Sequence, residues 1–160
     1  MVFLVLSISA DLENVKEFQP ASDDFDYLFK VKCTSCNEEH KKWITMNRTE
    51  IYEVSGGKHS TANFVWRCGL CKRESSAKFD PASPVKPYSS ANGEVKPLVT
   101  IECRGLEFID FDPKGDWKCF GIDSNLPFEV HLDDSEWTDY DEKAAQPVGI
   151  TNIESQWTRG

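Results

Sequence analysis

Apolar and polar residues alternate along much of the chain, and few segments show the wider spacing of a helix. The first alternating run places Leu4, Leu6 and Ile8 on one face, and it continues through Ala10 and Leu12. A period of two is typical of a β-strand with one buried face. The same alternation recurs in residues 27–33, 64–67 and 99–102. It predicts an all-β fold, a compact and mostly antiparallel β-sandwich or barrel-like structure.

Signals for other elements are weak. Only residues 135–145 have helical propensity, and their apolar spacing is poor, so we expect one helical turn there at most. The apolar runs at residues 43–45 and 51–54 are expected to pair as a hairpin. Gly56-Gly57 and Asn92-Gly93 signal turns.

Two parts of the chain resemble each other. Leu12-Glu13 matches Leu106-Glu107, and Pro20 matches Pro113. A repeat of this length fits a duplicated half-domain, whereas the alternative is two ordinary strand–turn–strand units that share these residues by chance. We predict a single β domain over residues 1–160. Its proposed parts are a first pseudo-repeat at residues 1–80, a proline-rich linker at 81–94 and a second pseudo-repeat at 95–160.

The apolar start of the chain has two interpretations. Residues 1–10 resemble a short signal-peptide core, but the first basic residue is Lys16, so the basic segment that precedes such a core is missing. The alternation and the internal match favour a strand. No run approaches the roughly 20 apolar residues that a membrane span requires. We therefore expect a cytoplasmic protein, with access to the nucleus and no membrane partner.

Charge limits the classes of partner. The 160 residues carry 18 basic and 27 acidic side chains, for a formal net charge of −9. Such a balance argues against a general binder of phosphate backbones, which needs a cationic face. The acidic excess falls almost entirely in residues 81–160, where we expect a binding partner to contact the protein.

Four of the six cysteines form two C-x2-C pairs, Cys33/Cys36 and Cys68/Cys71, with 31 residues between the pairs. A two-residue spacer lets both sulfurs of a turn face one ion, and four thiolates are the preferred closed shell of structural zinc. The sequence therefore predicts one structural Zn²⁺ held by these four cysteines. Two disulfides would need an oxidising compartment, and a thioredoxin-type redox pair would need one C-x2-C rather than two.

The remaining candidate ligands are assigned other roles. His40 follows the first pair closely enough to replace a sulfur, but four cysteines already fill the shell, so we interpret it as a surface histidine, together with His59 and His131. Cys103 and Cys119 lack C-x2-C partners and are interpreted as buried structural residues.

Two charged regions outside the cysteines are candidate recognition surfaces. Residues 133–142 are rich in aspartate and glutamate but do not match a calcium-binding loop, so a solvated face is expected. Within this run, Trp137 and Tyr140 either pack inward or form a protein-recognition patch. A basic rim surrounds the cysteine pairs, and it consists of Lys30, Lys32, Lys41, Lys42, Arg67, Lys72 and Arg73.

Four motifs in this order carry a family resemblance. They are Cys33-x-x-Cys36, Cys68-x-x-Cys71, Glu102-Cys-Arg-Gly-Leu-Glu107 and Trp137-Thr-Asp-Tyr-Asp-Glu-Lys143. Together they closely resemble the eukaryotic CXXC-motif-containing zinc-binding protein family, long known as a domain of unknown function. The resemblance extends over nearly the whole chain. It implies a compact, mostly β protein with zinc on the four matching cysteines, and it brings no established reaction. Asn37 and Lys72 stand where many zinc knuckles carry glycine.

The sequence favours a non-enzymatic zinc-binding protein, because no catalytic constellation accompanies the closed metal site. We expect it to be a monomer that binds another protein. The alternatives are a metal-handling or thiol-exchange protein that releases zinc from its cysteine pairs and, less favoured, nucleic-acid binding through the basic rim.

Overall fold

The structure, a computed structural model, describes residues 2–55, 60–90 and 92–160. The predicted Gly56-Gly57 turn and His59 lie outside these residues. The described residues contain no helix, and hence none that could cross a membrane. They form fourteen strands: β1 (Val2–Glu13), β2 (Val15–Pro20), β3 (Asp26–Cys33), β4 (Ile44–Asn47), β5 (Tyr52–Glu53), β6 (Thr61–Ala62), β7 (Phe64–Arg67), β8 (Glu74–Phe79), β9 (Lys96–Arg104), β10 (Leu106–Asp112), β11 (Gly115–Gly121), β12 (Pro127–Leu132), β13 (Trp137–Asp141) and β14 (Gln146–Arg159). The predicted all-β fold is confirmed.

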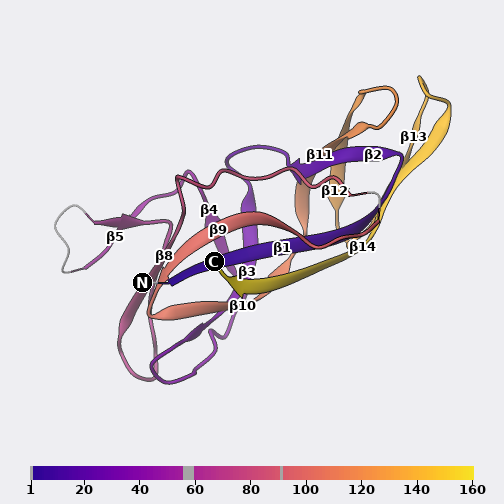
Figure 1. Ribbon diagram of the computed structural model, residues 1–160. Helices are drawn as coiled ribbons and strands as arrows, with labels where there is room; N and C mark the ends of the chain where they lie inside the picture. Colours follow the sequence, from indigo (N-terminus) through magenta and orange to yellow (C-terminus); the bar gives the residue numbers. More distant parts are fainter. Residues whose placement is uncertain (1, 56–59, 91) are drawn as a thin grey trace.

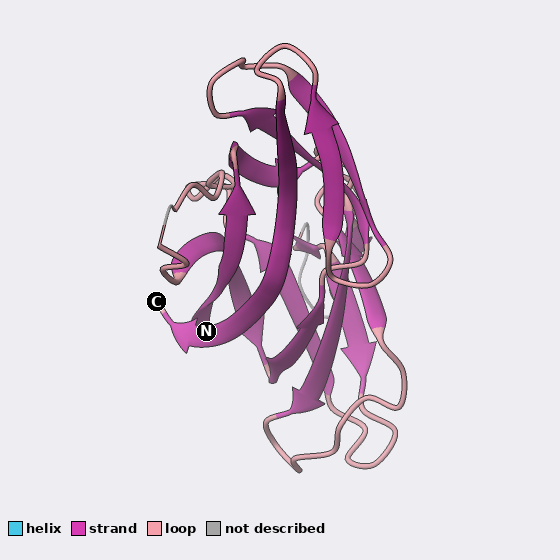
Figure 2. Ribbon diagram, turned by 90° about the vertical axis from the view of Figure 1, so that its right-hand side faces the viewer, coloured by secondary structure: helices cyan, strands magenta, loops and turns pink. Residues whose placement is uncertain are grey.

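The largest sheet has six strands in the order β13-β14-β1-β9-β8-β7, and it curls around the interior of the molecule (Figure 2). β1 lies between β14 and β9 and is antiparallel to both. The strand predicted at the start of the chain is therefore a central one. Its side chains Leu4, Leu6, Ile8 and Ala10 are buried, as the alternation predicts, and the intervening Ser7 and Ser9 are buried as well.

Two three-stranded sheets complete the fold, in the orders β10-β3-β4 and β12-β11-β2, and β5 and β6 form a separate hairpin. Each three-stranded sheet takes strands from both parts of the chain. β10, late in the sequence, pairs with β3, and β2, early in the sequence, pairs with β11. The two parts of the chain are therefore interleaved in a single unit.

The strand order has an internal correspondence. The six-stranded sheet reads β7, β8 and β9 from one edge, and β13, β14 and β1 from the other. Exchanging β1 to β4 with β9 to β12 likewise maps one three-stranded sheet onto the other. This arrangement is what two copies of one strand series would produce, and the pseudo-repeats stay a prediction.

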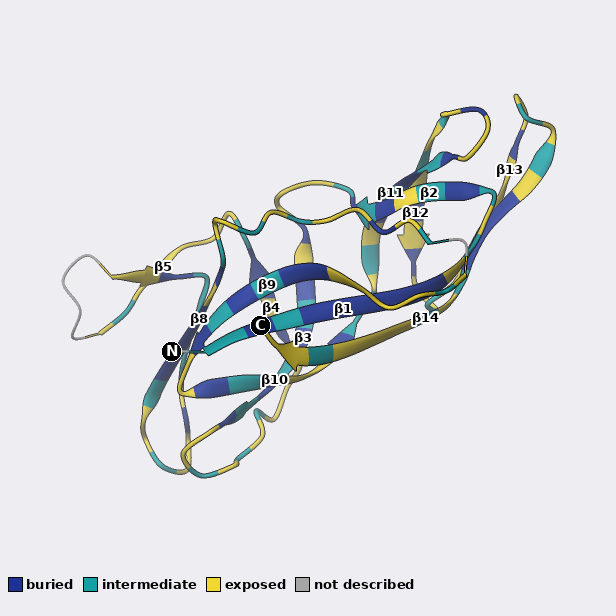
Figure 3. Ribbon diagram, in the orientation of Figure 1, coloured by how far each residue is buried: buried dark blue, intermediate teal, exposed yellow. Residues whose placement is uncertain are grey.

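Buried stretches of the strands face the interior (Figure 3), and the core that they form is rich in aromatic residues. Phe18 stacks on Trp117 with ring centroids 4.5 Å apart, and Phe108 stacks on Trp157 at 4.8 Å. Phe29 meets both Phe108 and Trp157 edge-on. Each of these contacts links segments distant in sequence, so the interior depends on the whole chain.

The segment predicted as a linker packs onto the core. Tyr88 is buried, and its backbone exchanges hydrogen bonds with Phe18. Its hydroxyl accepts the N–H of Ala10 at 3.2 Å and donates to the carbonyl of Glu94 at 2.7 Å. The connection between the predicted repeats is thus fixed at this point by a buried side chain.

Two local predictions are wrong. Residues 137–141 form β13 rather than a helical turn, because their backbone pairs with β14. The runs expected to form one hairpin separate as well: β4 pairs with β3, and β5 pairs with β6. In both cases pairing with a strand other than the expected one replaces the local structure that propensity suggested.

Candidate metal centre

Both C-x2-C motifs fold as the same tight turn at one end of the molecule, the lower left of Figure 1. In the first knuckle, which follows β3, Cys33 N–H donates to the carbonyl of Glu38 and Asn37 N–H donates to that of Cys33. In the second, between β7 and β8, Cys68 N–H donates to Arg73 and Lys72 N–H to Cys68. Each hydrogen bond measures 2.9 to 3.0 Å.

The fifth residue of each knuckle has a left-handed backbone. Asn37 and Lys72 both have φ of 63°, a conformation that glycine adopts without steric cost and other residues adopt rarely. This explains why glycine is common at these positions in zinc knuckles. Here an asparagine and a lysine take the same conformation, so the turn is preserved.

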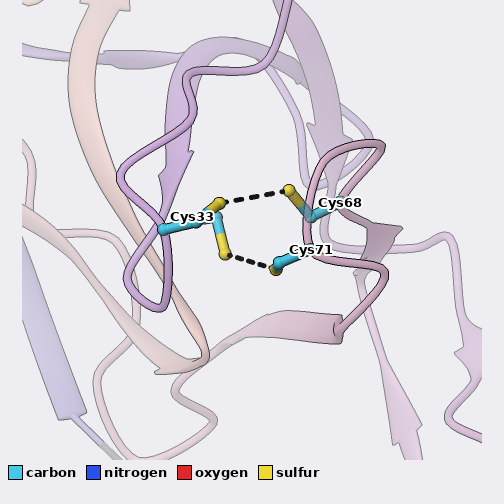
Figure 4. A group of neighbouring side chains, drawn as sticks. Cys33, Cys68 and Cys71 are labelled. Atoms are coloured by element: carbon cyan, nitrogen blue, oxygen red, sulfur yellow. Dashed lines mark hydrogen bonds between the residues drawn. The ribbon is translucent and has the colours of Figure 1, made fainter.

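The four sulfurs converge on one point (Figure 4). Cys33 Sγ lies 3.6 Å from Cys71 Sγ, and Cys36 Sγ lies 3.6 Å from Cys68 Sγ. All four lie within 4.8 Å of one another. A tetrahedral zinc with Zn–S bonds of about 2.3 Å places its sulfurs about 3.8 Å apart. The donor set therefore fits a single zinc ion bound by four cysteines.

The inner thiol of each knuckle, Cys33 and Cys68, has a lowered pKa, whereas the neighbouring thiols raise the pKa of Cys36. Burial alone would raise the pKa of Cys33, but the N–H groups of Cys36 and Ser35 and the neighbouring thiols outweigh it and lower the pKa to about 7. Hydrogen bonds from the N–H groups of Cys71 and Leu70 likewise lower the pKa of Cys68. These amides are available to stabilise thiolates around a cation.

Exposure differs within the site. Cys33 and Cys68 are buried, whereas Cys36 and Cys71 are half-buried. Each knuckle thus contributes one inner sulfur and one sulfur near the surface. A competing ligand would reach the metal from the side of Cys36 and Cys71.

His40 does not join the four sulfurs in the metal cluster. Its Nδ1 lies 3.1 Å from the backbone N–H of Lys42, and its ring lies against Trp66 with centroids 5.1 Å apart. His131 is exposed on β12, between Asp116 and Asp133.

The other two cysteines are buried away from the metal centre. Cys103 on β9 is 2% exposed and Cys119 on β11 is 0% exposed. Burial raises the pKa of both thiols to about 12. They remain protonated at neutral pH and pack as small apolar side chains.

A groove of about 600 Å³ lies beside the metal centre, between the segment that follows the first knuckle and the second knuckle. Trp66 and His40 form part of its wall, and Leu70, which is 65% exposed, lies at its edge. Lys41 and Lys42 also line it. Sequence patterns did not indicate this groove, because it joins residues from two separate loops.

The predicted acidic recognition patch is only partly exposed. Trp137 packs edge-on against Phe128 with ring centroids 5.8 Å apart, and Asp141 is completely buried. Tyr140 remains 52% exposed. Of the two candidate aromatics, one packs inward and one faces solvent.

Fold and site together define a class of protein: an antiparallel β-sheet protein with a four-cysteine metal centre at one end. The chain belongs to the eukaryotic CXXC motif containing zinc binding protein family, whose model matches residues 5–158.

The similarity to relatives and to solved structures extends over nearly the whole chain. It is 40% identical over 161 residues to the CXXC motif containing zinc binding protein of Xenopus laevis, covering 99% of each chain. It is 37% identical over 158 residues to the protein of that name from Homo sapiens, covering 98% of each. The crystal structure of C1orf123 superposes with a TM-score of 0.91 at 35% identity, covering 99% of each chain. A hypothetical protein from Plasmodium falciparum superposes with a TM-score of 0.87 at 28% identity, covering 99% of this chain and 100% of that one.

Proposed function

We propose that this protein is a non-enzymatic zinc-binding protein. In this proposal one structural Zn²⁺ on Cys33, Cys36, Cys68 and Cys71 holds the two knuckles together, and the groove beside them binds another protein. The observation that carries the proposal is the groove between the two segments that the metal would join.

The ligand set supports a structural rather than a catalytic metal. Catalytic zinc keeps a coordination position for water or substrate, whereas four cysteine sulfurs complete the tetrahedron. Four reduced cysteines that bind a metal also suit a reducing compartment such as the cytoplasm, where disulfides are rare.

The chemistry of the groove indicates its occupant. Leu70 and Trp66 offer apolar surface, and the ammonium groups of Lys41 and Lys42 have no carboxylate partner within the described residues. The groove therefore fits a protein segment with an apolar side chain flanked by acidic residues. The carboxylates of Glu38 and Glu39 interrupt the positive charge of the groove, whereas a continuous phosphate backbone needs an unbroken cationic face.

Affinity capture with matched variants tests this function. Leu70→Asp places a charge at the groove, while Ile122→Asp does the same at another exposed apolar residue, 50% exposed, in the turn between β11 and β12. We expect a protein retained by the unmodified chain and by Ile122→Asp to be lost at least tenfold with Leu70→Asp. Equal recovery from all three, or recovery abolished by nuclease, would contradict the proposal.

One observation favours a second function, metal handling by ligand exchange. The half-buried Cys36 and Cys71, one from each knuckle, give a competing thiol a side from which to attack. Competition against a chelator of known affinity distinguishes the two functions. Zinc kept at picomolar free metal supports the structural function, and zinc lost at nanomolar free metal supports exchange.

A further inference from the structure

Within the described residues, two further connections resemble the knuckle turns but carry no cysteine. Residues 121–126 connect β11 to β12, and there Gly121 N–H donates to Leu126 and Asn125 N–H to Gly121, at 2.9 and 3.0 Å. Both knuckles have the same two hydrogen bonds: the first residue donates its N–H to the carbonyl of the sixth, and the fifth donates to the carbonyl of the first. Residues 141–146 connect β13 to β14, and Asp141 pairs with Gln146. The fifth residues, Asn125 and Ala145, have φ of 57° and 54°.

These two turns occupy the places in the fold that correspond to the knuckles. The first knuckle follows β3, the middle strand of one three-stranded sheet, and residues 121–126 follow β11, the middle strand of the other. The second knuckle joins β7 to β8 at one edge of the six-stranded sheet. Residues 141–146 join β13 to β14 at the opposite edge. By position, Gly121, Ser124, Asp141 and Ala144 correspond to Cys33, Cys36, Cys68 and Cys71.

Side-chain contacts reproduce the arrangement of the metal ligands. Ser124 Oγ donates a hydrogen bond to Asp141 Oδ2, where the corresponding sulfurs of Cys36 and Cys68 lie 3.6 Å apart. Ser124 and Asp141 are 9% and 0% exposed. A Cβ added at Gly121 would collide with Ser124 Oγ and Asp141 Oδ2, so position 121 also faces the centre of the cluster.

The backbone N–H groups that donate to these atoms also occupy the same positions in the two clusters. The Asp141 carboxylate accepts hydrogen bonds from the amides of Lys143 and Ala144, as the Cys68 sulfur does from Leu70 and Cys71. Ser124 Oγ accepts the N–H of Leu126 at 3.1 Å, as the Cys36 sulfur does from Glu38. The amides that would stabilise thiolates at one end of the molecule stabilise a buried carboxylate at the other.

We infer that the cluster of Gly121, Ser124, Asp141 and Ala144 is a second, latent metal site of the tetrahedral four-cysteine type, in which the Ser124–Asp141 hydrogen bond joins the two turns in place of a metal. Two oxygen ligands from serine and aspartate, with none from glycine and alanine, leave the natural cluster without a zinc shell. The backbone nevertheless presents four positions with knuckle geometry. Four cysteines there would bind a soft divalent cation.

The test introduces Gly121→Cys, Ser124→Cys, Asp141→Cys and Ala144→Cys together into the otherwise unmodified chain. Titration with Co²⁺ alone, followed by absorption, measures the binding stoichiometry and reports tetrahedral thiolate coordination. We expect one equivalent more than the unmodified chain binds, with a tetrathiolate spectrum. If the variant instead folds only when metal is added and then binds the same extra equivalent, this outcome supports the inference equally.

A two-thiol control, Ser124→Cys with Asp141→Cys, should bind no extra tight equivalent, because two sulfurs do not close the shell. The inference is overturned if the four-cysteine variant gains no equivalent, folded or unfolded, or if the two-thiol control binds as tightly. It is independent of the proposed protein-binding function, because the readout is the difference in metal content between two chains.

Discussion

At the scale of single residues, Gly121 shows how closely the latent cluster is packed. A methyl group at this position would overlap the Ser124–Asp141 pair, which is buried and linked to backbone amides. Overpacking of this kind typically costs about 1–3 kcal/mol. We therefore predict that Gly121→Ala lowers the free energy of unfolding by that amount, measured by urea denaturation.

Gly69 provides the matched control for this prediction. It lies in the second knuckle, and an added Cβ would meet no atom within 4 Å. Gly69→Ala should therefore change stability by less than about 0.5 kcal/mol, as exposed substitutions usually do. Equal effects of the two substitutions would show that the region around Gly121 has room to relax.

His131 gives a prediction for pH. Its Nδ1–H donates a hydrogen bond to the carboxylate of Asp116 at 2.7 Å, and Oδ1 of Asp133 lies 3.0 Å from Nε2. The hydrogen bond to Asp116 and the negative charge of Asp133 raise the pKa of His131 above 6.5. Its contribution to stability is therefore complete below about 6.5 and is lost as pH rises through the folded-state pKa. An NMR titration should show a raised midpoint that Asp116→Asn lowers, and an unchanged midpoint would contradict this assignment.

At the scale of elements, the two ends of the molecule depend on different chemistry. The knuckles would be joined by a metal, and structural zinc supplies on the order of 10 kcal/mol of folding free energy. The turns at residues 121–126 and 141–146 are joined by a hydrogen bond. We predict that chelation raises amide hydrogen exchange in the knuckles and leaves those two turns protected.

The converse variant completes this test. Asp141→Ala removes the hydrogen bond and leaves buried amides without an acceptor, which costs about 1–3 kcal/mol for each unsatisfied group. Exchange should then rise at residues 121–126 and 141–146, with the knuckles unaffected while metal is bound. Exchange that rises uniformly after either treatment would mean that the ends are not independent.

The elements differ in how well the sequence predicted them. β1 was predictable because the alternation of Leu4, Leu6 and Ile8 continues long enough to define a buried face. β13 was not, because Thr138 to Tyr140 are exposed at the edge of a sheet and the one fully buried residue of the strand, Asp141, is polar. An edge strand rich in acidic residues lacks the apolar period that identifies a strand.

The metal centre was predictable for a different reason. The two-residue spacing within each cysteine pair sets the turn locally, so position along the chain is enough to name the four ligands. The groove and the Ser124–Asp141 pair depend on which strands become neighbours. Serine and aspartate 17 positions apart have no distinguishing pattern in sequence, and only the correspondence of strand order reveals them.

At the scale of the whole molecule, the interleaving of strands determines what can fold alone. β1 has β14 and β9 as its neighbours, and β3 has β10 beside it, so the first part of the chain takes most of its partners from the second. Isolated residues 1–94 would expose the face that Phe18 presents to Trp117 and the edges of β1. Unpaired central strands and exposed apolar surface do not form a stable sheet.

We therefore predict that residues 1–94 and residues 95–160, expressed separately, give the poorly dispersed NMR spectra of unfolded chains even with zinc present. Mixing the two fragments should restore a dispersed spectrum. Zinc can join the knuckles of the first fragment, but it cannot replace the pairing of β1 with β9 and β14. A dispersed spectrum from the first fragment alone would show that each pseudo-repeat carries its own fold. In that case each pseudo-repeat would be an independent unit, and β2 and β10 would be strands exchanged between the two units.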